Sequence, residues 1–371
     1  GLNGGGKGFY ALDISMPNSP SLLWEFTPTG GHGAITDNDI GYSFGQPIIT
    51  KRADGRWVVL VSSGYNNTVP GNGMGYLYVL DAGTGTILSK IPTGVGSVAT
   101  PSGLAKVAGW NNAPGGNEVG FAYGGDLLGN VWRFDINDPA SATIGTGSAF
   151  QLATLFSDTA GANPQPITTT PILGKILGKR VIFVGTGQYL GSSDLTSIQP
   201  QTQYAIKDDD ATTTIVNPRN TLVQQMLTLD SLADSLAGNR TSSGNTVDFG
   251  TDLGWFVDFP DSGERVNIDS KLILGSLLVP TIVPSSSTCS PGGTGWLNVL
   301  NYKTGTAVDT VASLKYDSPI VGVNIIYIQG NPMVEVVTAA NPTPTLEQGV
   351  DFQASSAGFS SKRMIRRELI Q

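Results

Sequence analysis

A short line of alternating side chains recurs along the chain and constrains its fold more than any other feature. Each copy alternates aromatic and aliphatic residues and ends in Asp or another polar residue. The clear copies cover residues 8–13, 75–81 and 129–135, and weaker copies cover residues 203–207 and 295–301. Alternation with a period of two indicates half-buried β-strands, so the sequence predicts several copies of one β-strand unit.

Further elements recur around this line at nearly constant spacing. A proline begins a short apolar segment 34 positions before the end of the line in two units and 36 positions before it in a third: residues 47–81, 101–135 and 171–207. A buried strand lies between them, and a hairpin follows the line. Four short strands per unit are typical of a propeller blade. We predict an all-β fold, a modified β-propeller with five to seven blades, each a four-stranded antiparallel sheet.

The two ends of the chain carry complementary halves of a unit. Residues 8–26 hold only late-blade elements, and residues 319–337 hold only early ones. A blade assembled from both ends would remove free sheet edges, which otherwise invite aggregation. We therefore expect residues 1–340 to form one propeller closed by pairing of the N- and C-terminal strands. Residues 341–371 would form a polar, basic tail.

One polar segment, residues 208–253, interrupts the repeats. Within residues 220–236 the apolar side chains are spaced as on one face of a helix: Leu222, Met226, Leu229, Leu232 and Leu236. This spacing predicts an insertion that carries a short helix.

Composition excludes several functional classes. The net charge is −8 and the isoelectric point is about 4.6, which argues against nucleic acid as a partner, because phosphate binding requires a basic surface. The longest apolar run, residues 271–283, is shorter than the roughly 18 to 20 residues that span a bilayer.

A single histidine and a single cysteine restrict the chemistry further. His32 cannot form a multi-histidine zinc site, and its glycine-rich surroundings favour a solvated loop over a catalytic triad. Cys289 cannot form an internal disulfide or a CxxC pair, and whether it pairs outside this chain stays open.

Several lines resemble one known family, the C-terminal β-propeller of the PilC/PilY-type proteins of type IV pili. The matching stretches run in order along nearly the whole chain: residues 4–14, 23–26, 41–47, 63–67, 122–135, 185–190 and 263–266. The family's long N-terminal region is not part of this sequence, so we expect the chain to be the C-terminal part of a larger protein.

The resemblance implies a non-enzymatic role in pilus assembly, retraction control and adhesion. It implies a location in the periplasm, at the pilus tip or on the cell surface of a Gram-negative bacterium. The implied partners are minor pilins or the pilus tip complex, the protein's own N-terminal region, and a host surface.

The resemblance also implies calcium in a blade loop, yet the residues here depart from the family pattern. The acidic positions fall on Asn112, Pro114, Gly116 and Gly120, and Glu118 is out of register. Calcium requires six to eight oxygen ligands, so we predict that this loop does not bind it. The other oxygen-rich clusters, with Asp37 and Asp39 in one and Asp208 and Asp210 in the other, are weak calcium candidates that are more simply explained as solvated charge. No cofactor is expected, with calcium left as an open candidate.

Two alternatives remain open. The line at residues 78–85 is similar to the propeller of quinone-dependent dehydrogenases, but those enzymes usually need a vicinal disulfide as well as a calcium-bound quinone. No GxSxG, Walker or strand-linked GxGxxG motif is present. The second alternative is a periplasmic propeller scaffold of an outer-membrane assembly complex.

Overall fold

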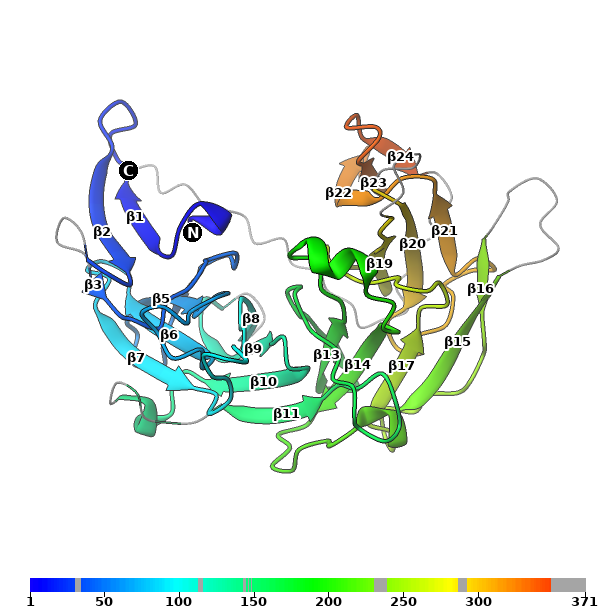
Figure 1. The fold of residues 1–371 in the computed structure, drawn as a ribbon, viewed down its shortest axis with the longest axis horizontal. Helices are drawn as coiled ribbons and strands as arrows, with labels where there is room; N and C mark the ends of the chain where they lie inside the picture. The colour runs from blue at the N-terminus through cyan, green and yellow to red at the C-terminus, as the bar shows by residue number, and fades with distance from the viewer. Residues whose placement is uncertain are drawn as a thin grey trace.

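The computed structural model describes residues 1–30, 35–112, 116–142, 145, 147, 149–229, 239–285 and 292–347. Strands dominate these residues, and the helices among them are short 3-10 turns. The strands form successive sheets that follow one another around a common centre (Figure 1), and we call them blades 1 to 6. The predicted all-β propeller of five to seven blades is confirmed.

Blades 2 and 3 are complete four-stranded antiparallel sheets. Blade 2 contains β4 (Ile48–Lys51), β5 (Trp57–Ser62), β6 (Tyr76–Asp81) and β7 (Ile87–Pro92). Blade 3 contains β8 (Lys106–Asn111), β9 (Val119–Gly125), β10 (Asn130–Asp135) and β11 (Phe150–Thr154), with the 3-10 helix η2 (Pro139–Ala142) before its last strand. The recurring sequence line forms the third strand in both blades, as predicted.

Blades 4 and 5 belong to one continuous ten-stranded sheet. Blade 4 contains β12 (Ile172–Ile176), β13 (Lys179–Gly185), β14 (Thr202–Asp208) and β17 (Gly254–Asp258), with η3 (Ser192–Thr196) in its upper loop. Blade 5 contains β18 (Lys271–Ile273), β19 (Ser276–Val283), β20 (Thr294–Asn301) and β21 (Ser313–Tyr316). Two further strands join the outer edges of these blades: β15 (Val223–Leu229) and β16 (Arg240–Ser242), preceded by η4 (Pro218–Asn220).

The predicted helix over residues 220–236 is wrong for the part that the structure describes. β15 lies there instead and pairs in parallel with β17. Its burial alternates over residues 225–228, with Gln225 and Leu227 buried and Met226 and Thr228 exposed, which is the period of a strand. The open edge of β17 offers backbone partners that an isolated short helix would lack. Leu232 and Leu236 lie outside the described residues.

Blades 1 and 6 each contain three strands. Blade 1 contains β1 (Phe9–Asp13), β2 (Ser21–Thr27) and β3 (Ile35–Thr36), preceded by η1 (Asn3–Gly5). Blade 6 contains β22 (Ile320–Ile328), β23 (Asn331–Thr338) and β24 (Thr345–Glu347). The two sheets are separate and stand apart in Figure 1.

This separation corrects two expectations. The N- and C-terminal strands do not pair, because the edge of β23 that would accept β1 is already paired with β24. β24 also extends the folded sheet beyond residue 340, the predicted end of the propeller. Residues 348–371, which make up most of the predicted tail, lie outside the described residues.

Among the described residues, the hydrophobic core consists of five clusters, one between each pair of successive blades. Representative buried pairs from neighbouring blades are Phe26 and Tyr78, Leu60 and Trp132, Val131 and Ile182, Phe183 and Leu277, and Leu297 and Val334. Each blade is therefore stabilised mainly by apolar contact with its neighbours.

One tryptophan contact occurs at two of these interfaces. Trp24 of blade 1 donates its indole Nε1–H to the Ala82 carbonyl of blade 2 at 3.0 Å, and Trp255 of blade 4 donates to the Tyr302 carbonyl of blade 5 at 3.1 Å. In both cases the ring covers a turn glycine with φ +71°, Gly85 or Gly305, where a Cβ would collide with the ring. The glycines thus permit both the turn and the close packing.

Candidate functional site

One face of the propeller is formed by two kinds of loop, those that join the second strand of a blade to its third and those that join one blade to the next. We call them the upper loops. The longest described loop of blade 4 joins β13 to β14 and is held by Arg265 of the following connection. The buried Arg265 guanidinium donates to the carbonyl oxygens of Gly263, Gln188, Asp194 and Ser197 at 2.6–3.0 Å. One side chain therefore fixes the path of a whole loop.

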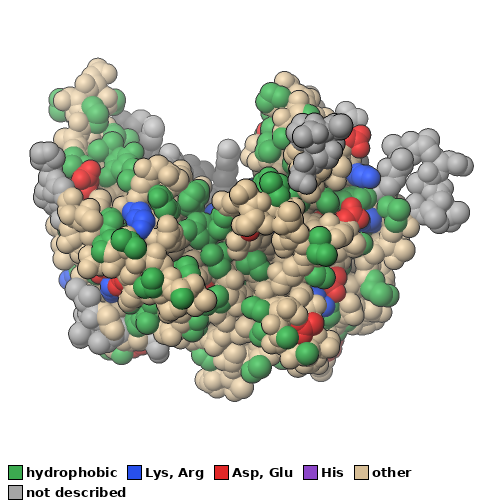
Figure 2. All heavy atoms as spheres, viewed as in Figure 1, with side chains coloured by type: hydrophobic (Ala, Val, Ile, Leu, Met, Phe, Trp, Pro, Cys, Tyr) green, Lys and Arg blue, Asp and Glu red, His purple; other side chains and the backbone are tan. Residues whose placement is uncertain are grey.

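This fixed loop exposes apolar side chains. Tyr189, Leu190 and Ile198 are all exposed, although their backbone is anchored by Arg265. Figure 2 shows hydrophobic side chains among mostly uncharged surface on the face turned to the viewer. Preorganised apolar side chains in loops are suited to protein contacts, because little chain entropy is lost when a partner binds.

The Asp37 and Asp39 cluster is brought together in space, but the cation beside it belongs to the protein. Lys90 Nζ lies 2.8 Å from Asp37 Oδ1 and 2.7 Å from Asp39 Oδ2, and 4.4 Å from the centre of the Tyr76 ring. Burial alone would lower the pKa of Lys90, but the hydrogen bonds to Asp37 and Asp39 raise it above its usual value. Lys90 thus binds both carboxylates, and its single positive charge offsets one of their two negative charges.

The second acidic cluster is likewise paired with cations. Buried Asp208 accepts hydrogen bonds from Arg133 Nη1 and Tyr123 Oη, both at 2.6 Å, and Asp210 pairs with Arg180. Burial alone would raise the pKa of Asp208, yet the hydrogen bonds from Tyr123 and Arg133 and the charges of Arg133 and Arg180 hold it below its usual value. The cluster joins blades 3 and 4.

The third candidate pair, Asn112 and Glu118, lies at the end of the β8–β9 hairpin. Asn112 Nδ2 donates to Glu118 Oε1 at 3.3 Å, and the Asn112 amide N–H donates to the Glu118 carbonyl at 3.0 Å. These described residues do not fit a calcium site, because they bond to each other and bring only one carboxylate. Pro114 lies outside the described residues, as do His32 and Cys289.

Among the residues that the structure describes, no group of three or more His, Cys, Asp or Glu side chains could hold a metal ion.

A further ion pair lies where three blades converge. Lys106 Nζ of blade 3 lies 2.8 Å from Asp269 Oδ1, and Asp269 also accepts hydrogen bonds from the Thr170 amide and hydroxyl at 2.9 Å. Burial alone would raise the pKa of Asp269, but the Lys106 charge and these hydrogen bonds hold it below its usual value. The pair connects blades 3 and 5 through the segment that leads into β12.

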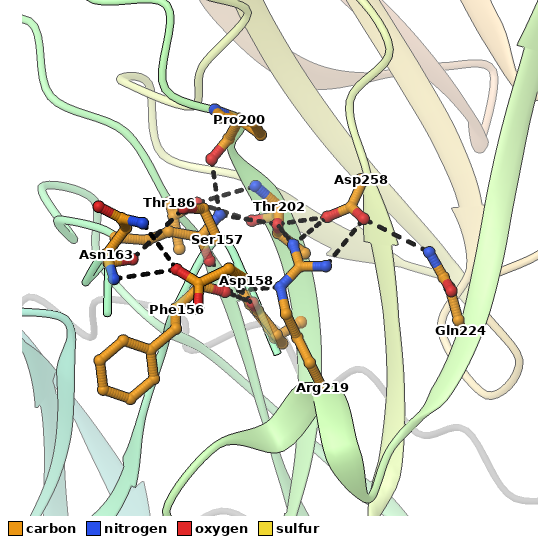
Figure 3. A network of polar contacts seen from close by, with 12 residues as sticks. Phe156, Ser157, Asp158, Asn163, Thr186, Pro200, Thr202, Arg219, Gln224 and Asp258 are labelled. Atoms are coloured by element: carbon orange, nitrogen blue, oxygen red, sulfur yellow. Dashed lines mark hydrogen bonds and ion pairs between the residues drawn. The ribbon is translucent and has the colours of Figure 1, made fainter. Parts of the chain in front are cut away.

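A polar network fixes the start of the insertion (Figure 3). Arg219 pairs with Asp258, with Nη1 3.0 Å from Oδ2, and its Nε donates to the Phe156 carbonyl at 2.6 Å. Its Nη2 also donates to Thr202 Oγ1 at 2.8 Å, and its guanidinium lies 4.9 Å from the centre of the Phe256 ring. The network positions β15 beside β17.

The end of the insertion is fixed by a buried charge pair that the sequence did not reveal. Arg240 donates through both Nη atoms to Glu264 at 2.9 and 2.8 Å, and Nη2 lies 2.8 Å from Asp261 Oδ1. Its guanidinium lies 3.6 Å from the centre of the Trp296 ring. Burial raises the pKa of Glu264, although the bonds from Arg240 oppose the shift.

Asp126 is a second group that the sequence did not single out. It is fully buried and accepts hydrogen bonds from the Leu128 and Asn130 amides, the Asn130 side chain and Trp132 Nε1. Burial raises its pKa, and these donors oppose the shift. The spacing Asp126-Asn130-Trp132 was the available signal, since an Asp before a tight turn often caps the turn amides.

Comparison with known proteins assigns the family. A model described as the PilY1 beta-propeller domain matches residues 1–240. The chain belongs to the PilY1 β-propeller family. The resemblance predicted from the sequence is thus confirmed.

Curated relatives in this family are much longer than the chain. The Type IV pilus biogenesis factor PilY1 of Pseudomonas aeruginosa PAO1 is 32% identical over 82% of this chain, and the match covers 28% of that protein. A PilY1 homolog of Xylella fastidiosa is 28% identical over 100% of this chain and 30% of its own length. The chain therefore spans less than a third of these relatives.

A solved structure supports the fold. The crystal structure of the Pseudomonas aeruginosa PilY1 C-terminal domain matches 93% of this chain with 26% identity and a TM-score of 0.73. The match covers 79% of that domain. The two folds are therefore similar.

Proposed function

We propose that this chain is the propeller module of a type IV pilus biogenesis factor and acts without catalysis, through protein–protein contacts. The observation that carries this proposal is the 32% identity to PilY1 of Pseudomonas aeruginosa over 82% of the chain. The proposed contribution is to pilus assembly, to the control of retraction and to adhesion.

The geometry supports contacts over catalysis. Asp37, Asp39 and Asp208 pair with Lys90 or with arginines, and Asp126 is closed off from solvent by neutral donors. A general acid or base must reach a substrate proton, which these groups cannot do while they hold their present partners. Tyr189 and Leu190, by contrast, are exposed on a fixed loop.

The proposed location is the periplasm, the pilus tip or the surface of a Gram-negative cell. The proposed partners are minor pilins or the pilus tip complex, the remainder of its own polypeptide, and a host surface. In the described part of the chain, no helix is long and apolar enough to cross a membrane.

The test replaces the PilY1-type gene of a piliated Gram-negative strain with the gene of the full-length protein. The variant Tyr189→Ser/Leu190→Ser removes the apolar contacts of the upper loop. Its matched control, Leu177→Ser, removes an exposed side chain at the opposite end of blade 4. We expect normal pili with the wild type and the control, and loss of surface pili and twitching with the double variant.

Two further readouts separate the finer roles. Recovery of pili by the double variant in a retraction-deficient strain would assign the loop to retraction control, whereas continued loss would assign it to assembly. Attachment of cells with normal pilus number reports adhesion. Full piliation and motility in a strain whose PilY1-type protein lacks this whole propeller would contradict the proposal.

A further inference from the structure

The third strand is placed differently in blade 1 than in the complete blades. β6, β10, β14 and β20 each pair with strands on both edges. Among the described residues, β1 carries the same sequence line but pairs only with β2. No described strand fills the place beside β1 that a second strand fills in the other blades.

The outward face of blade 1 is apolar as well as uncovered by described residues. Tyr10, Leu12 and Leu22 are 49%, 45% and 46% exposed, whereas Phe9 and Trp24 on the opposite face are buried against blade 2. Leu12 and Leu22 are directly opposite each other in the ladder. An open edge next to exposed apolar side chains favours strand addition.

The described C-terminal strands do not fill this place. β23 pairs with β22 on one edge and with β24 on the other. Blade 6 also shows exposed apolar side chains on its outward face, with Ile328 at 44% and Leu346 at 40%. Figure 2 shows the notch between the two raised ends of the molecule. Both sides of the notch thus present apolar surface that no described residue covers.

We propose that the free edge of β1 receives a β-hairpin from the part of the same polypeptide that lies outside these 371 residues. The strand of the hairpin that pairs with β1 should be apolar, because the corresponding strands of blades 2 and 4, β5 and β13, have apolar middle residues that are buried on both faces. Main-chain hydrogen bonds would supply affinity and the apolar side chains would extend the face of blade 1.

The comparisons support this source of the hairpin. The chain covers only 79% of the related PilY1 C-terminal domain and 28–30% of the full-length relatives. In a polypeptide of the relatives' length, further chain would be available to β1 at high effective concentration.

Hydrogen exchange tests the proposal by comparing the full-length protein with the 371-residue chain. In the chain we expect about half of the β1 amides, those that face the free edge, to exchange quickly. In the full-length protein we expect their exchange to slow at least about a hundredfold, to the level of β6. The β7 amides that face solvent are the internal control, and they should exchange at equal rates in both proteins.

Three results would overturn it. Equally fast β1 exchange in both proteins would show that the edge stays free. Protection that rises with protein concentration would assign the edge to a second copy. Protection in the 371-residue chain that disappears on truncation after Glu347 would assign it to residues 348–371.

Discussion

Two junctions of the propeller differ in how their blades are joined. Blades 4 and 5 are connected by an apolar cluster and also by β15 and β16, which merge them into one sheet. Blades 1 and 6 share no sheet, and no apolar cluster among the described residues joins them. The inserted hairpin therefore strengthens one inner junction, between blades 4 and 5, whereas the two end blades share no sheet.

The largest expected effect comes from breaking the charge pair of the connected junction. Arg240→Ala would leave Glu264 buried without its cation, which costs about 3–5 kcal/mol. Urea unfolding followed by tryptophan fluorescence measures the loss. The double variant Arg240→Met/Glu264→Gln is the control, since it removes both charges and should recover much of the stability. A loss below about 1 kcal/mol for Arg240→Ala would contradict the assigned role.

The contacts that fix the start of the insertion should be testable independently of those that fix its end. Arg219→Ala removes the bonds to Asp258 and the Phe156 carbonyl, and we expect a loss of about 1–3 kcal/mol. Exchange of the β15 amides should accelerate, while exchange in blade 2 should not change. Thr196→Ala, at an exposed hydroxyl of the β13–β14 loop, is the control. Uniform acceleration in all blades would show that Arg219 supports the whole propeller instead.

The Asp208 cluster gives a pH-dependent effect. Because its pKa is lowered in the folded protein, Asp208 contributes stability above its unfolded pKa of about 3.9, and this contribution disappears as the pH falls through the folded value. Asp208→Asn should therefore cost about 2 kcal/mol at pH 7 and less near pH 3. Thermal unfolding from pH 7 to pH 3 measures the difference. A constant difference across this range would mean that the charge of Asp208 does not matter.

How much of the structure could be predicted from the sequence depends on how many positions along the chain separate the interacting residues. The third strands β6 and β10 were readable because alternation is local. Lys90 could not be assigned to Asp37, nor Arg133 to Asp208, because 53 and 75 positions separate the partners. The segment that forms β15 was predicted as a helix, because its spacing gives no sign of its partner β17, which follows later in the chain. The separation of β1 from β23 was missed because it depends on the pairing of β23 with β24.

The smallest expected effect concerns calcium. Lys90 occupies the space between Asp37 and Asp39, and Asn112 is bonded to Glu118, so we expect no micromolar calcium binding by metal-stripped protein in isothermal titration. Binding that vanishes in Asn112→Ala/Glu118→Ala would place calcium in the β8–β9 loop. Binding that vanishes in Asp37→Asn/Asp39→Asn would place it beside Lys90 and contradict the internal pairing.

Disulfide trapping tests most directly whether the two ends of the chain stay apart. In a Cys289→Ser background, Ala11→Cys/Glu335→Cys places thiols on β1 and β23, and Asn324→Cys/Glu335→Cys places them on directly opposite residues of β22 and β23. We predict that mild oxidation closes the second pair within the monomer and leaves the first pair reduced. Rapid closure of the first pair in the 371-residue chain would show that β1 and β23 share a sheet and would contradict the open arrangement.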